Sequence, residues 1–280
     1  MPAHKNVTTE SLGVKIVLIG AACSVLVFFL LMPLAAVFLE AFRKGAEVFA
    51  KALVEPAAMS AIKLTLITAA VTVPFNALFG VAAAWLVTKF RFPGRSLLLS
   101  LIDLPFAVSP VIAGLVWMLI FGSKGWFGPW LDKHDLQIVF DTPGIIIATI
   151  FVTFPFVARE LIPLMETQGT DEEEAAVTLG AHGWQIFRRV TLPNIKWGLL
   201  YGVLLCNARA MGEFGAVSVV SGHIRGKTNT LPLQVEVLYN EYQSSAAFAC
   251  ASLLALLALV TLIVKDVIER YAGHAGSKGH

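Results

Sequence analysis

Four polar residues stand inside an apolar stretch between residues 195 and 220, and their types suit the binding of an anion. They are Asn207, Arg209, Glu213 and Ser218. A charge near the centre of a bilayer costs about 2.5 to 3.5 kcal/mol, so such residues usually face a cavity or a partner. Arg209 and Glu213 are four residues apart, on one face of a helix, which predicts an ion pair. Arg209 would attract the anion and Glu213 would limit its grip, or the pair would be structural and fix helix packing.

A second group of residues lies in a charged segment, residues 166–194, which we call the knob. It contains Glu174-Ala175-Ala176, then Gly180, and finally Leu192-Pro193. Apolar stretches flank it on both sides. None of these residues is a nucleophile or a metal ligand at a recognisable spacing, so the chemistry that the knob can offer is docking.

Local signals predict how the knob folds. Thr170 and Glu173 fit a capping box, which predicts a short helix that begins near Asp171. Gly180 predicts the end of that helix, because glycine readily adopts the left-handed backbone of a C-cap. A second short helix is expected over residues 182–190, and Pro193 predicts a sharp re-entry into the next apolar stretch. Two short helices at an angle would transmit rigid-body movement between proteins.

The composition requires that these groups sit in an integral membrane protein. Of 280 residues, 57% are hydrophobic and 14% charged, and the mean hydropathy is +0.75. The net charge of +2 is not gathered in a basic patch, so no nucleic-acid partner is expected. The cysteines Cys23, Cys206 and Cys250 lie in apolar runs, which predicts packing and no disulfide or metal site.

Six apolar stretches reach spanning length, so the predicted fold is all-α with six transmembrane helices. An even number places both termini on one side, and Lys and Arg are more numerous on that side, which predicts that it is cytoplasmic. The first stretch is too long for a signal peptide and is expected to be retained. The predicted organisation is a cytoplasmic segment 1–15, a transmembrane domain 16–265 and a cytoplasmic tail 266–280. The stretches are 16–39, 64–88, 97–121, 144–165, 195–220 and 244–264.

Prolines within the stretches predict kinks or breaks in the helices. Pro105 and Pro110 lie so close together that an interrupted third helix is expected. Asp103 precedes them, about 9 Å inside the cytoplasmic end of its span at 1.5 Å per residue. It would either reach the headgroups or serve a transport route.

The spacing from Glu174 to Pro193 closely resembles the "EAA" loop of membrane-spanning subunits of bacterial ATP-binding-cassette importers. There the loop docks on a cytoplasmic ATPase. The wider stretch from about Asn76 to Asp266 resembles the permeases of sulfate/thiosulfate importers, of the CysW type. The segments that carry this likeness are LSLIDLPFAVSPV at 99–111, GWQIFRRVTLPNIKWGLLY at 183–201 and NARAMGEFGAVSVVSG at 207–222.

The resemblance implies a MetI-like permease fold, in which the knob is a cytoplasmic two-helix coupling loop. It implies a non-catalytic subunit of the bacterial inner membrane, with Mg-ATP on the partner ATPase and no cofactor or metal on this chain. The implied partners are two ATP-binding cassette ATPase subunits, a homologous second permease of the CysT type, a periplasmic sulfate/thiosulfate-binding protein and membrane lipid. The residues expected to couple to the ATPase are Glu174, Ala175, Ala176, Gly180 and Pro193.

Several alternatives remain at this stage. The substrate could be molybdate, tungstate or another oxyanion, and the sequence itself leaves a homodimer possible. An intramembrane metalloprotease needs histidine ligands at membrane depth, but all six histidines lie outside the stretches. A secondary transporter would often show internal repeats, which we do not find. Residues 222–228 are one residue too short for a phosphate loop, and Arg225 and Lys227 there are either ordinary exposed cations or contacts for an anion.

Overall fold

The protein is helical throughout the part that the structure describes. The computed structural model describes residues 12–276, with side chains from 13 to 267. The predicted terminal segments 1–15 and 266–280 therefore lie partly outside the described residues. The helices are α1 (Leu12–Leu26), α2 (Met32–Phe42), α3 (Ala46–Val54), α4 (Pro56–Lys89), α5 (Arg95–Ala107), α6 (Pro110–Phe121), α7 (Gly128–Lys133), α8 (Thr142–Thr153), α9 (Pro155–Gln168), α10 (Asp171–Thr178), α11 (Gly183–Ile186), α12 (Leu192–Met211), α13 (Gly215–Ser221), α14 (Leu231–Asn240) and α15 (Ser244–Gly276), with π-helical turns η1 (Val27–Leu31) and η2 (Phe187–Thr191).

All six predicted spanning segments are present among the described residues. Four helical segments are each long and apolar enough to cross a bilayer, and they are Gly13–Phe42, Pro56–Lys89, Thr142–Gln168 and Ser244–Val267. The other two are bent pairs, in which α5 is followed by α6 and α12 by α13. The prediction of an all-α membrane protein is therefore confirmed, and its six spans are present when each bent pair counts as one span.

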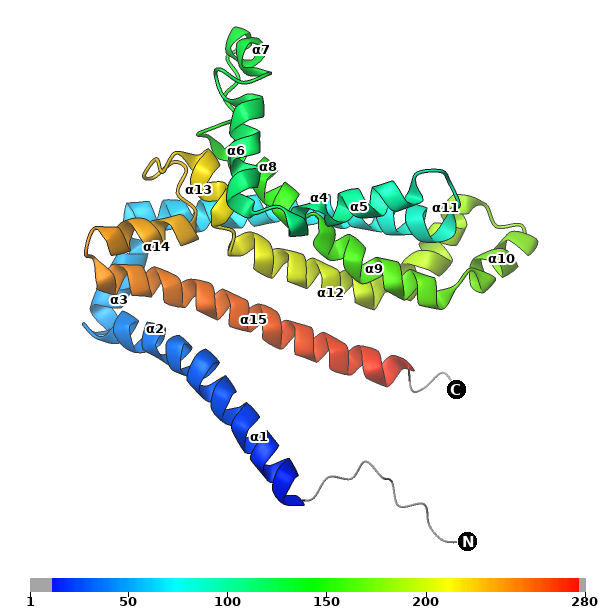
Figure 1. The fold of residues 1–280 in the computed structure, drawn as a ribbon, viewed down its shortest axis with the longest axis horizontal. Helices are drawn as coiled ribbons and strands as arrows, with labels where there is room; N and C mark the ends of the chain where they lie inside the picture. Colours follow the sequence, from blue (N-terminus) through cyan, green and yellow to red (C-terminus); the bar gives the residue numbers. More distant parts are fainter. Residues whose placement is uncertain (1–11, 277–280) are drawn as a thin grey trace.

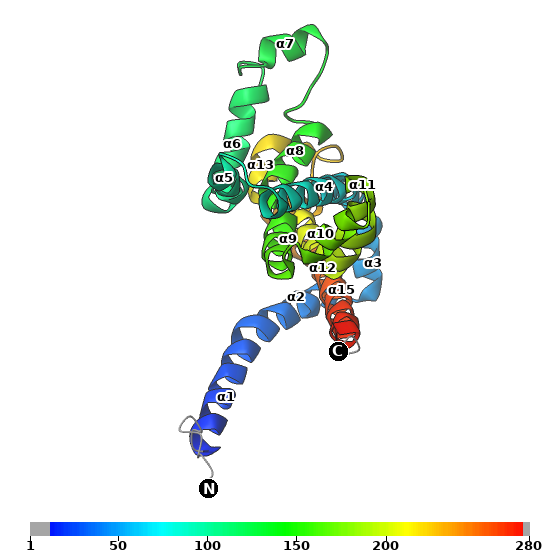
Figure 2. The same ribbon diagram turned by 90° about the vertical axis from the view of Figure 1, so that its right-hand side faces the viewer.

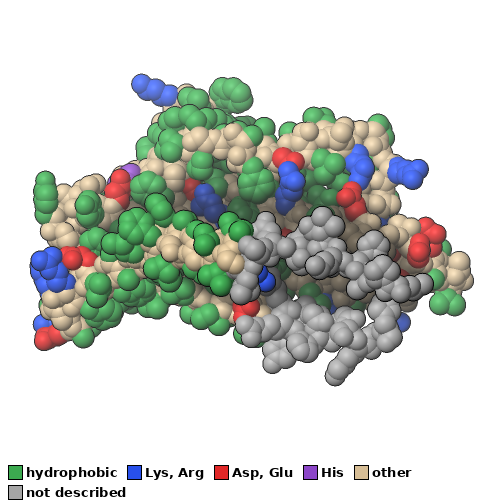
Figure 3. Space-filling view, turned by 60° about the horizontal axis from the view of Figure 1, so that its bottom comes forward, with side chains coloured by type: hydrophobic (Ala, Val, Ile, Leu, Met, Phe, Trp, Pro, Cys, Tyr) green, Lys and Arg blue, Asp and Glu red, His purple; other side chains and the backbone are tan. Residues whose placement is uncertain are grey.

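The long helices lie side by side along the long axis of the molecule. Helices α4, α9, α12 and α15 form this bundle, with α10 and α11 at one end and α3 and α14 at the other (Figure 1). The starting end of α1 and the final end of α15 point toward the end where α10 and α11 lie. Two parts leave the bundle: α1 on one side, and α6 with α7 on the opposite side (Figure 2). In Figure 3, hydrophobic side chains gather mainly over the left half of the face drawn, whereas charged side chains stand at both ends and also along its middle and upper right part.

The bundle is held by close helix packing at Val157 of α9. A Cβ added to Gly80 of α4 would lie 2.6 Å from the Val157 Cβ, and one added to Gly202 of α12 would lie 3.2 Å from its Cα. The approach at Gly80 leaves no room for a Cβ, and the one at Gly202 is tighter than most Cβ contacts, as is common where small residues lie between membrane helices. The core around this point includes Leu161, Ile195 and other fully buried residues, so α9 is clamped between α4 and α12.

The third predicted helix turns a corner. Helix α5 ends at Ala107, Val108 has an extended backbone, and α6 begins at Pro110 at an angle of 107° to α5. The interruption predicted from Pro105 and Pro110 is confirmed, but Pro105 stays inside α5 and the break falls before Pro110. The cause is local, because the residue before a proline avoids the helical backbone.

The predicted sharp re-entry at Pro193 is wrong. The chain is helical without a break from Gly183 through η2 into α12, so the second helix of the knob continues directly into the fifth span. In η2 the backbone N–H of Leu192 bonds to the carbonyl of Phe187, five residues back. This wider turn accommodates the proline that follows, whose ring otherwise clashes with the preceding turn. The same arrangement occurs at η1, just before Pro33.

A buried asparagine satisfies the backbone where the fourth span is broken. Pro155 begins α9 directly after α8, so the last carbonyls of α8 lose their normal donors. The Asn76 Nδ2 atom of α4 donates to the carbonyl of Ile150 at 3.3 Å and to Thr153 Oγ1 at 2.7 Å. Asn76 is fully buried. It therefore ties α4 to the broken span by polar contacts that the hydrocarbon could not supply.

Candidate functional site

The first helix of the knob begins where the sequence predicts, but through different contacts. Thr170 is the N-cap of α10, and its carbonyl accepts from the Glu174 N–H at 2.9 Å. Its hydroxyl donates to Glu174 Oε1 at 2.8 Å and caps no backbone N–H. The predicted capping box with Glu173 is therefore wrong, because Glu173 is engaged elsewhere. Four acidic residues in the first turn still suit the positive end of the helix.

Gly180 ends α10 as predicted. Its φ is +81°, a left-handed backbone that glycine adopts most readily. The Gly180 N–H donates to the Val177 carbonyl at 2.9 Å, and the Ala181 N–H donates to the Ala176 carbonyl at 3.0 Å. These two bonds are the pattern of a Schellman motif. They fix the direction in which the chain leaves α10.

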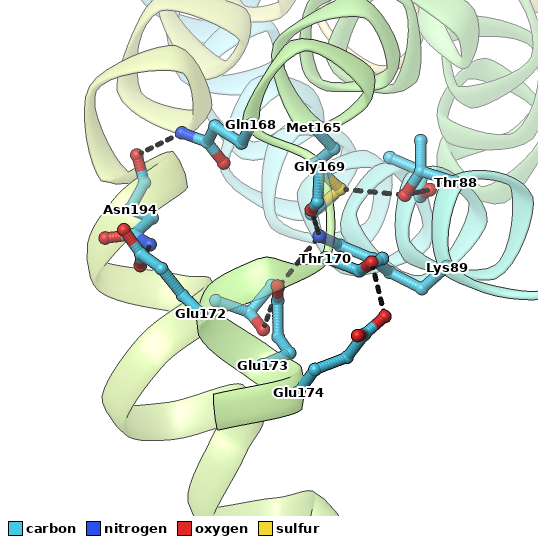
Figure 4. A network of polar contacts seen from close by, with 12 residues as sticks. Thr88, Lys89, Met165, Gln168, Gly169, Thr170, Glu172, Glu173, Glu174 and Asn194 are labelled. Carbon is cyan, nitrogen blue, oxygen red and sulfur yellow. Dashed lines mark hydrogen bonds and ion pairs between the residues drawn. The ribbon is translucent and has the colours of Figure 1, made fainter. Parts of the chain in front are cut away.

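Lys89, at the end of α4, fastens the knob to the bundle (Figure 4). Its Nζ lies 2.8 Å from Glu173 Oε1 and also donates to the Gly169 carbonyl. Only 8% of the Lys89 side chain and 18% of the Glu173 side chain are exposed. Thr191 of η2 donates to the same Glu173 oxygen at 3.2 Å. One carboxylate therefore joins the end of α4, the start of α10 and the turn before α12.

A second set of contacts holds the other side of α10. Asn194 Nδ2 donates to Glu172 Oε2, and Gln168 Nε2 donates to the Asn194 carbonyl at 3.1 Å. Sequence reasoning did not single out Lys89, Glu172 or Asn194 for this role. The position of Glu172 and Glu173 directly before Glu174 is the signal that could have indicated their role in holding the knob. Lys89 is distant in the sequence and gives no such signal beyond its charge.

The free surface of the knob is apolar at its tip. Leu179 is 88% exposed, and Val177 and Trp184 also expose more than half of their surface. The Trp184 ring stacks on Phe187, with centroids 5.6 Å apart. The predicted residues Glu174, Ala175 and Gly180 are exposed beside this tip, and Ala176 is half-buried. An exposed apolar tip on a rigidly held helix is suited to insertion into a partner protein.

The predicted ion pair of the fifth span forms at the break between α12 and α13. Arg209 Nη1 lies 2.6 Å from Glu213 Oε2, although their angle is not that of a hydrogen bond. Glu213 follows the end of α12, so the pair does not lie within one continuous helix as expected. Its other oxygen accepts from the Ala216 N–H at 2.9 Å and so caps α13. Glu213 is 2% exposed and Arg209 is partly exposed.

The other two residues predicted for the substrate route are not drawn into this pair. Asn207 is half-buried in α12, and its side chain makes no hydrogen bond to another described residue. Ser218 is half-buried in α13, where its hydroxyl donates to the Gly215 carbonyl at 2.8 Å. Of the four candidates, the structure therefore brings together only Arg209 and Glu213.

Asp103 has a partner that sequence reasoning missed. Arg159 Nε of α9 donates to Asp103 Oδ1 of α5 at 2.5 Å. Arg159 lies in the interior of α9 and not at the end of a span. Two opposite charges within apolar stretches are the signal that could have suggested the pair. Asp103 therefore bonds across to a neighbouring helix.

The cations of the segment 222–228 are both paired. Arg225 bonds to Glu241, and Lys227 Nζ lies 3.0 Å from Asp141 Oδ2. Asp141 also accepts from the Thr142 N–H at the start of α8. The hydrogen bond from the Thr142 backbone and the contact with Lys227 lower the pKa of Asp141. These pairs favour the interpretation of Arg225 and Lys227 as ordinary surface cations. The segment 222–228 follows the helix α13, whereas a phosphate loop follows a strand.

Among the described residues, no group of three or more His, Cys, Asp or Glu side chains could hold a metal ion. The features described above are charge pairs inside the bundle and an exposed apolar surface at its end.

The sequence matches the family described as "Binding-protein-dependent transport system inner membrane component" over residues 76–272. It is 58% identical over 265 residues to the "Sulfate transport system permease protein CysW" of Synechocystis, covering 95% of this chain and 96% of the relative. The Escherichia coli K12 protein of the same name is 56% identical over 252 residues, 90% of this chain and 87% of the relative. The "Sulfate transport system permease protein CysT" of Escherichia coli K12 is 37% identical, with 91% and 94% covered.

Solved structures agree at the level of the fold. A bacterial alginate ABC transporter, in complex with an alginate pentasaccharide-bound periplasmic protein, contains a chain that matches with a TM-score of 0.75 at 19% identity. The match covers 92% of this chain and 94% of that one. Since the match to the family extends over most of the chain and whole-length relatives exceed half identity, this multi-pass membrane protein belongs to the family of inner membrane components of binding-protein-dependent transport systems.

Proposed function

We propose that the chain is the permease subunit of an ATP-driven importer of sulfate, with thiosulfate as a shared substrate. The observation that carries the proposal is the identity of 58% and 56% to relatives named as sulfate permeases, over nearly their whole length. The alternative substrates, molybdate and tungstate, have no comparable support. The charge pairs within the spans suit the passage of an anion.

The knob is the docking element for a separate ATPase. Its apolar tip around Leu179 enters the partner, and Glu174, Ala175 and Ala176 shape the helix that bears it. Gly180 fixes the angle behind the tip, and Pro193 marks where the knob joins the fifth span. ATP hydrolysis with Mg²⁺ takes place on two copies of that ATPase, and this chain supplies no catalytic residue or cofactor site.

The translocation route runs past the break between α12 and α13. Arg209 provides the attraction for the anion there, Glu213 limits it, and Asn207 and Ser218 offer neutral hydrogen-bonding groups. A homologous second permease of the CysT type completes the route as a heterodimer, which the 37% identity to a relative with that name supports. A periplasmic binding protein delivers the solute.

The proposed docking of the knob on a cytoplasmic ATPase also fixes the orientation of the chain in the membrane. The end of the bundle with α10 and α11 faces the cytoplasm of the bacterial inner membrane, and the helical ends that lead to both termini point the same way. The positive charges flanking the spans favour this orientation.

The deciding experiment is ATP-dependent uptake of labelled sulfate into vesicles that contain this chain with its ATPase, second permease and binding protein. Uptake that thiosulfate blocks and molybdate does not is the expected result. If an assembled complex hydrolyses ATP but carries molybdate instead of sulfate, the proposal of sulfate as the substrate is contradicted. The assignment to the importer class then still holds.

A further inference from the structure

The ion pair of Asp103 and Arg159 lies within the membrane-spanning region. A second pair joins the same two helices, with Arg95 Nη2 of α5 located 2.8 Å from Glu166 Oε1 of α9. Asp103 is eight residues beyond Arg95, and Arg159 is seven before Glu166. At 1.5 Å per residue, the pair lies about 10 to 12 Å deeper than Arg95 and Glu166. Arg95 and Glu166 flank the apolar stretches 97–121 and 144–165, so with a hydrocarbon core of about 30 Å the deeper pair falls within the bilayer.

The pair is exposed on the surface of the chain in spite of that depth. The Arg159 side chain is 56% exposed and the Asp103 side chain 37%. Charges at this depth seldom face hydrocarbon, because lipid cannot solvate them. The surface between α5 and α9 therefore faces water or a polar partner. A transport route between two permeases supplies such surroundings.

The guanidinium of Arg159 has donors to spare. Its contact with Asp103 uses Nε, and within the described residues no hydrogen bond engages its two Nη atoms. These atoms carry four N–H groups in a planar fork, a geometry that matches the oxygens of tetrahedral oxyanions. Arg159 can therefore hold an anion while it remains bound to Asp103.

An aromatic pair lies one helical turn deeper on the same two helices. Phe106 of α5 and Phe156 of α9 meet edge to face, with ring centroids 5.3 Å apart. The seam between α5 and α9 thus presents, in order, the pair of Arg95 and Glu166, then Asp103 and Arg159, then the two rings. Apolar rings beside the ion pair lower the local polarity and strengthen the attraction of Arg159 for an anion.

The pair at the break of the fifth span is less suited to this task. Glu213 is fixed in place, because it is 2% exposed and caps α13 through its second oxygen. The Arg209 side chain is 34% exposed, against 56% for Arg159. Asp103, by contrast, is partly exposed, and within the described residues no hydrogen bond engages its second carboxylate oxygen.

We propose that Arg159 is an oxyanion-binding residue of the translocation route and that Asp103 is its built-in counter-ion. The inference rests on the proposed function, since it names the residues that meet the anion between the break in α12 and α13 and the cytoplasmic end. Arg159 binds the divalent anion through its free N–H groups. Asp103 keeps the net charge of the pair at zero, so that the anion is bound weakly enough to leave.

The test uses the complete transporter with its ATPase, second permease and binding protein. Arg159→Gln is expected to lower sulfate uptake at least tenfold, while assembly and ATP hydrolysis stay within twofold of the unmodified complex. The same substitution is expected to abolish the binding of labelled sulfate to the detergent-solubilised complex, measured without the binding protein. Asp103→Asn is expected to bind sulfate at least threefold more tightly and to transport it more slowly, because the counter-ion is gone.

Arg95→Gln is the matched control. It removes an arginine of the same seam that is also paired with a carboxylate, and its uptake is expected to stay within twofold. Unchanged uptake by Arg159→Gln overturns the proposal. Recovery of uptake in Asp103→Asn combined with Arg159→Gln also overturns it, because that result assigns the pair a structural role.

If Arg159→Gln does not assemble, Arg159→Lys decides the question. Lysine keeps the charge and loses the fork, so the expected result is an assembled complex with uptake reduced about three- to tenfold. Full uptake by this variant contradicts the proposal. If the unmodified complex carries another oxyanion instead of sulfate, the proposed substrate fails, and the same variants assayed with that oxyanion still decide the role of Arg159.

Discussion

At the scale of single residues, Arg209 with Glu213 and Asp103 with Arg159 form charge pairs within the spans, and the distance between the partners in the sequence decides which pair could be foreseen. Arg209 and Glu213 are four residues apart, so helical geometry predicted their contact. Asp103 and Arg159 are 56 residues apart, and their contact depends on how two helices pack. A local rule does not reach such a pair.

Replacement of Arg209 is expected to lower stability as well as transport. Arg209→Leu leaves Glu213 buried without its partner, and breaking a buried pair costs about 3–5 kcal/mol. We therefore expect a lower melting temperature of the purified complex as well as loss of sulfate uptake. Adding Glu213→Gln removes the unpaired charge and keeps an oxygen that can cap α13, so stability should recover.

Uptake in that double variant separates the two roles of Arg209. Uptake that remains absent from a stable, ATP-hydrolysing complex supports contact of Arg209 with the anion. Uptake that returns with stability shows that the arginine served helix packing alone.

Asn76 should prove a stability determinant without a direct role in transport. Asn76→Ala removes the donor to the Ile150 carbonyl and to Thr153 in the core of the bundle. An unsatisfied buried polar group costs about 1–3 kcal/mol, so thermal unfolding in detergent should shift to lower temperature. Ser100→Ala is the control, because Ser100 is exposed and bonds only within its own helix. Equal melting temperatures for the two variants would contradict this role.

At the scale of elements, the knob shows where sequence reasoning succeeds and where it stops. The end of α10 follows from Gly180, since a left-handed C-cap is a local effect, and its start was predicted correctly although the Thr170 side chain caps no backbone N–H. The continuity of α11 with α12 was missed, because proline usually marks a boundary and the π-helical turn before Pro193 has no recognised sequence signal. The contact of Lys89 with Glu173 was missed because it spans 84 residues.

Lys89 should matter for the coupling of ATP hydrolysis to transport. Lys89→Met leaves Glu173 without its ion pair and frees the first turn of α10 from the end of α4. We expect sulfate uptake to fall at least fivefold while ATP hydrolysis continues, which is measured as the ratio of sulfate transported to ATP hydrolysed. Lys63→Met on the same helix is the control, since Lys63 is exposed and makes no ion pair with another described residue.

An exchange of the two charges gives an independent check of that coupling role. Lys89→Glu combined with Glu173→Lys restores the pair in reverse, and it should recover part of the lost ratio. A ratio unchanged by Lys89→Met would show that the tie does not carry the movement of the knob.

At the scale of the whole molecule, the number of spans could be predicted and their directions could not. Hydropathy gives length and polarity for each stretch, and all six were found among the described residues. The break before Pro110 has a local cause, but the 107° angle between α5 and α6 could not be predicted; α6 packs against α13, where a Cβ on Gly114 would lie 2.7 Å from the Ala216 carbonyl oxygen. Such packing is a property of the folded molecule.

The orientation is open to a labelling experiment. Tyr242, between α14 and α15, and Leu179, next to the end of α10, are each more than four-fifths exposed, and these elements lie at opposite ends of the bundle. In intact cells stripped of their outer membrane, a maleimide that cannot cross the bilayer should label Tyr242→Cys and leave Leu179→Cys unlabelled. In inside-out vesicles, Leu179→Cys should react once the ATPase is removed and be protected when it is added back. The unmodified chain is the control, because it measures labelling of the native cysteines. The opposite labelling pattern would show that the chain has the opposite orientation.

The π-helical turn η2 also sets an angular phase between the knob and the fifth span. A π-helical turn holds one more residue than an α-helical turn, and each residue of an α-helix rotates the chain by about 100°. The apolar tip therefore points about 100° away from where an uninterrupted helix would aim it relative to α12. Deleting one residue from Phe187–Thr191 would convert η2 to an ordinary α-helical turn and rotate the apolar tip around the helix axis. The extra residue therefore determines the direction, around that axis, from which a partner can dock.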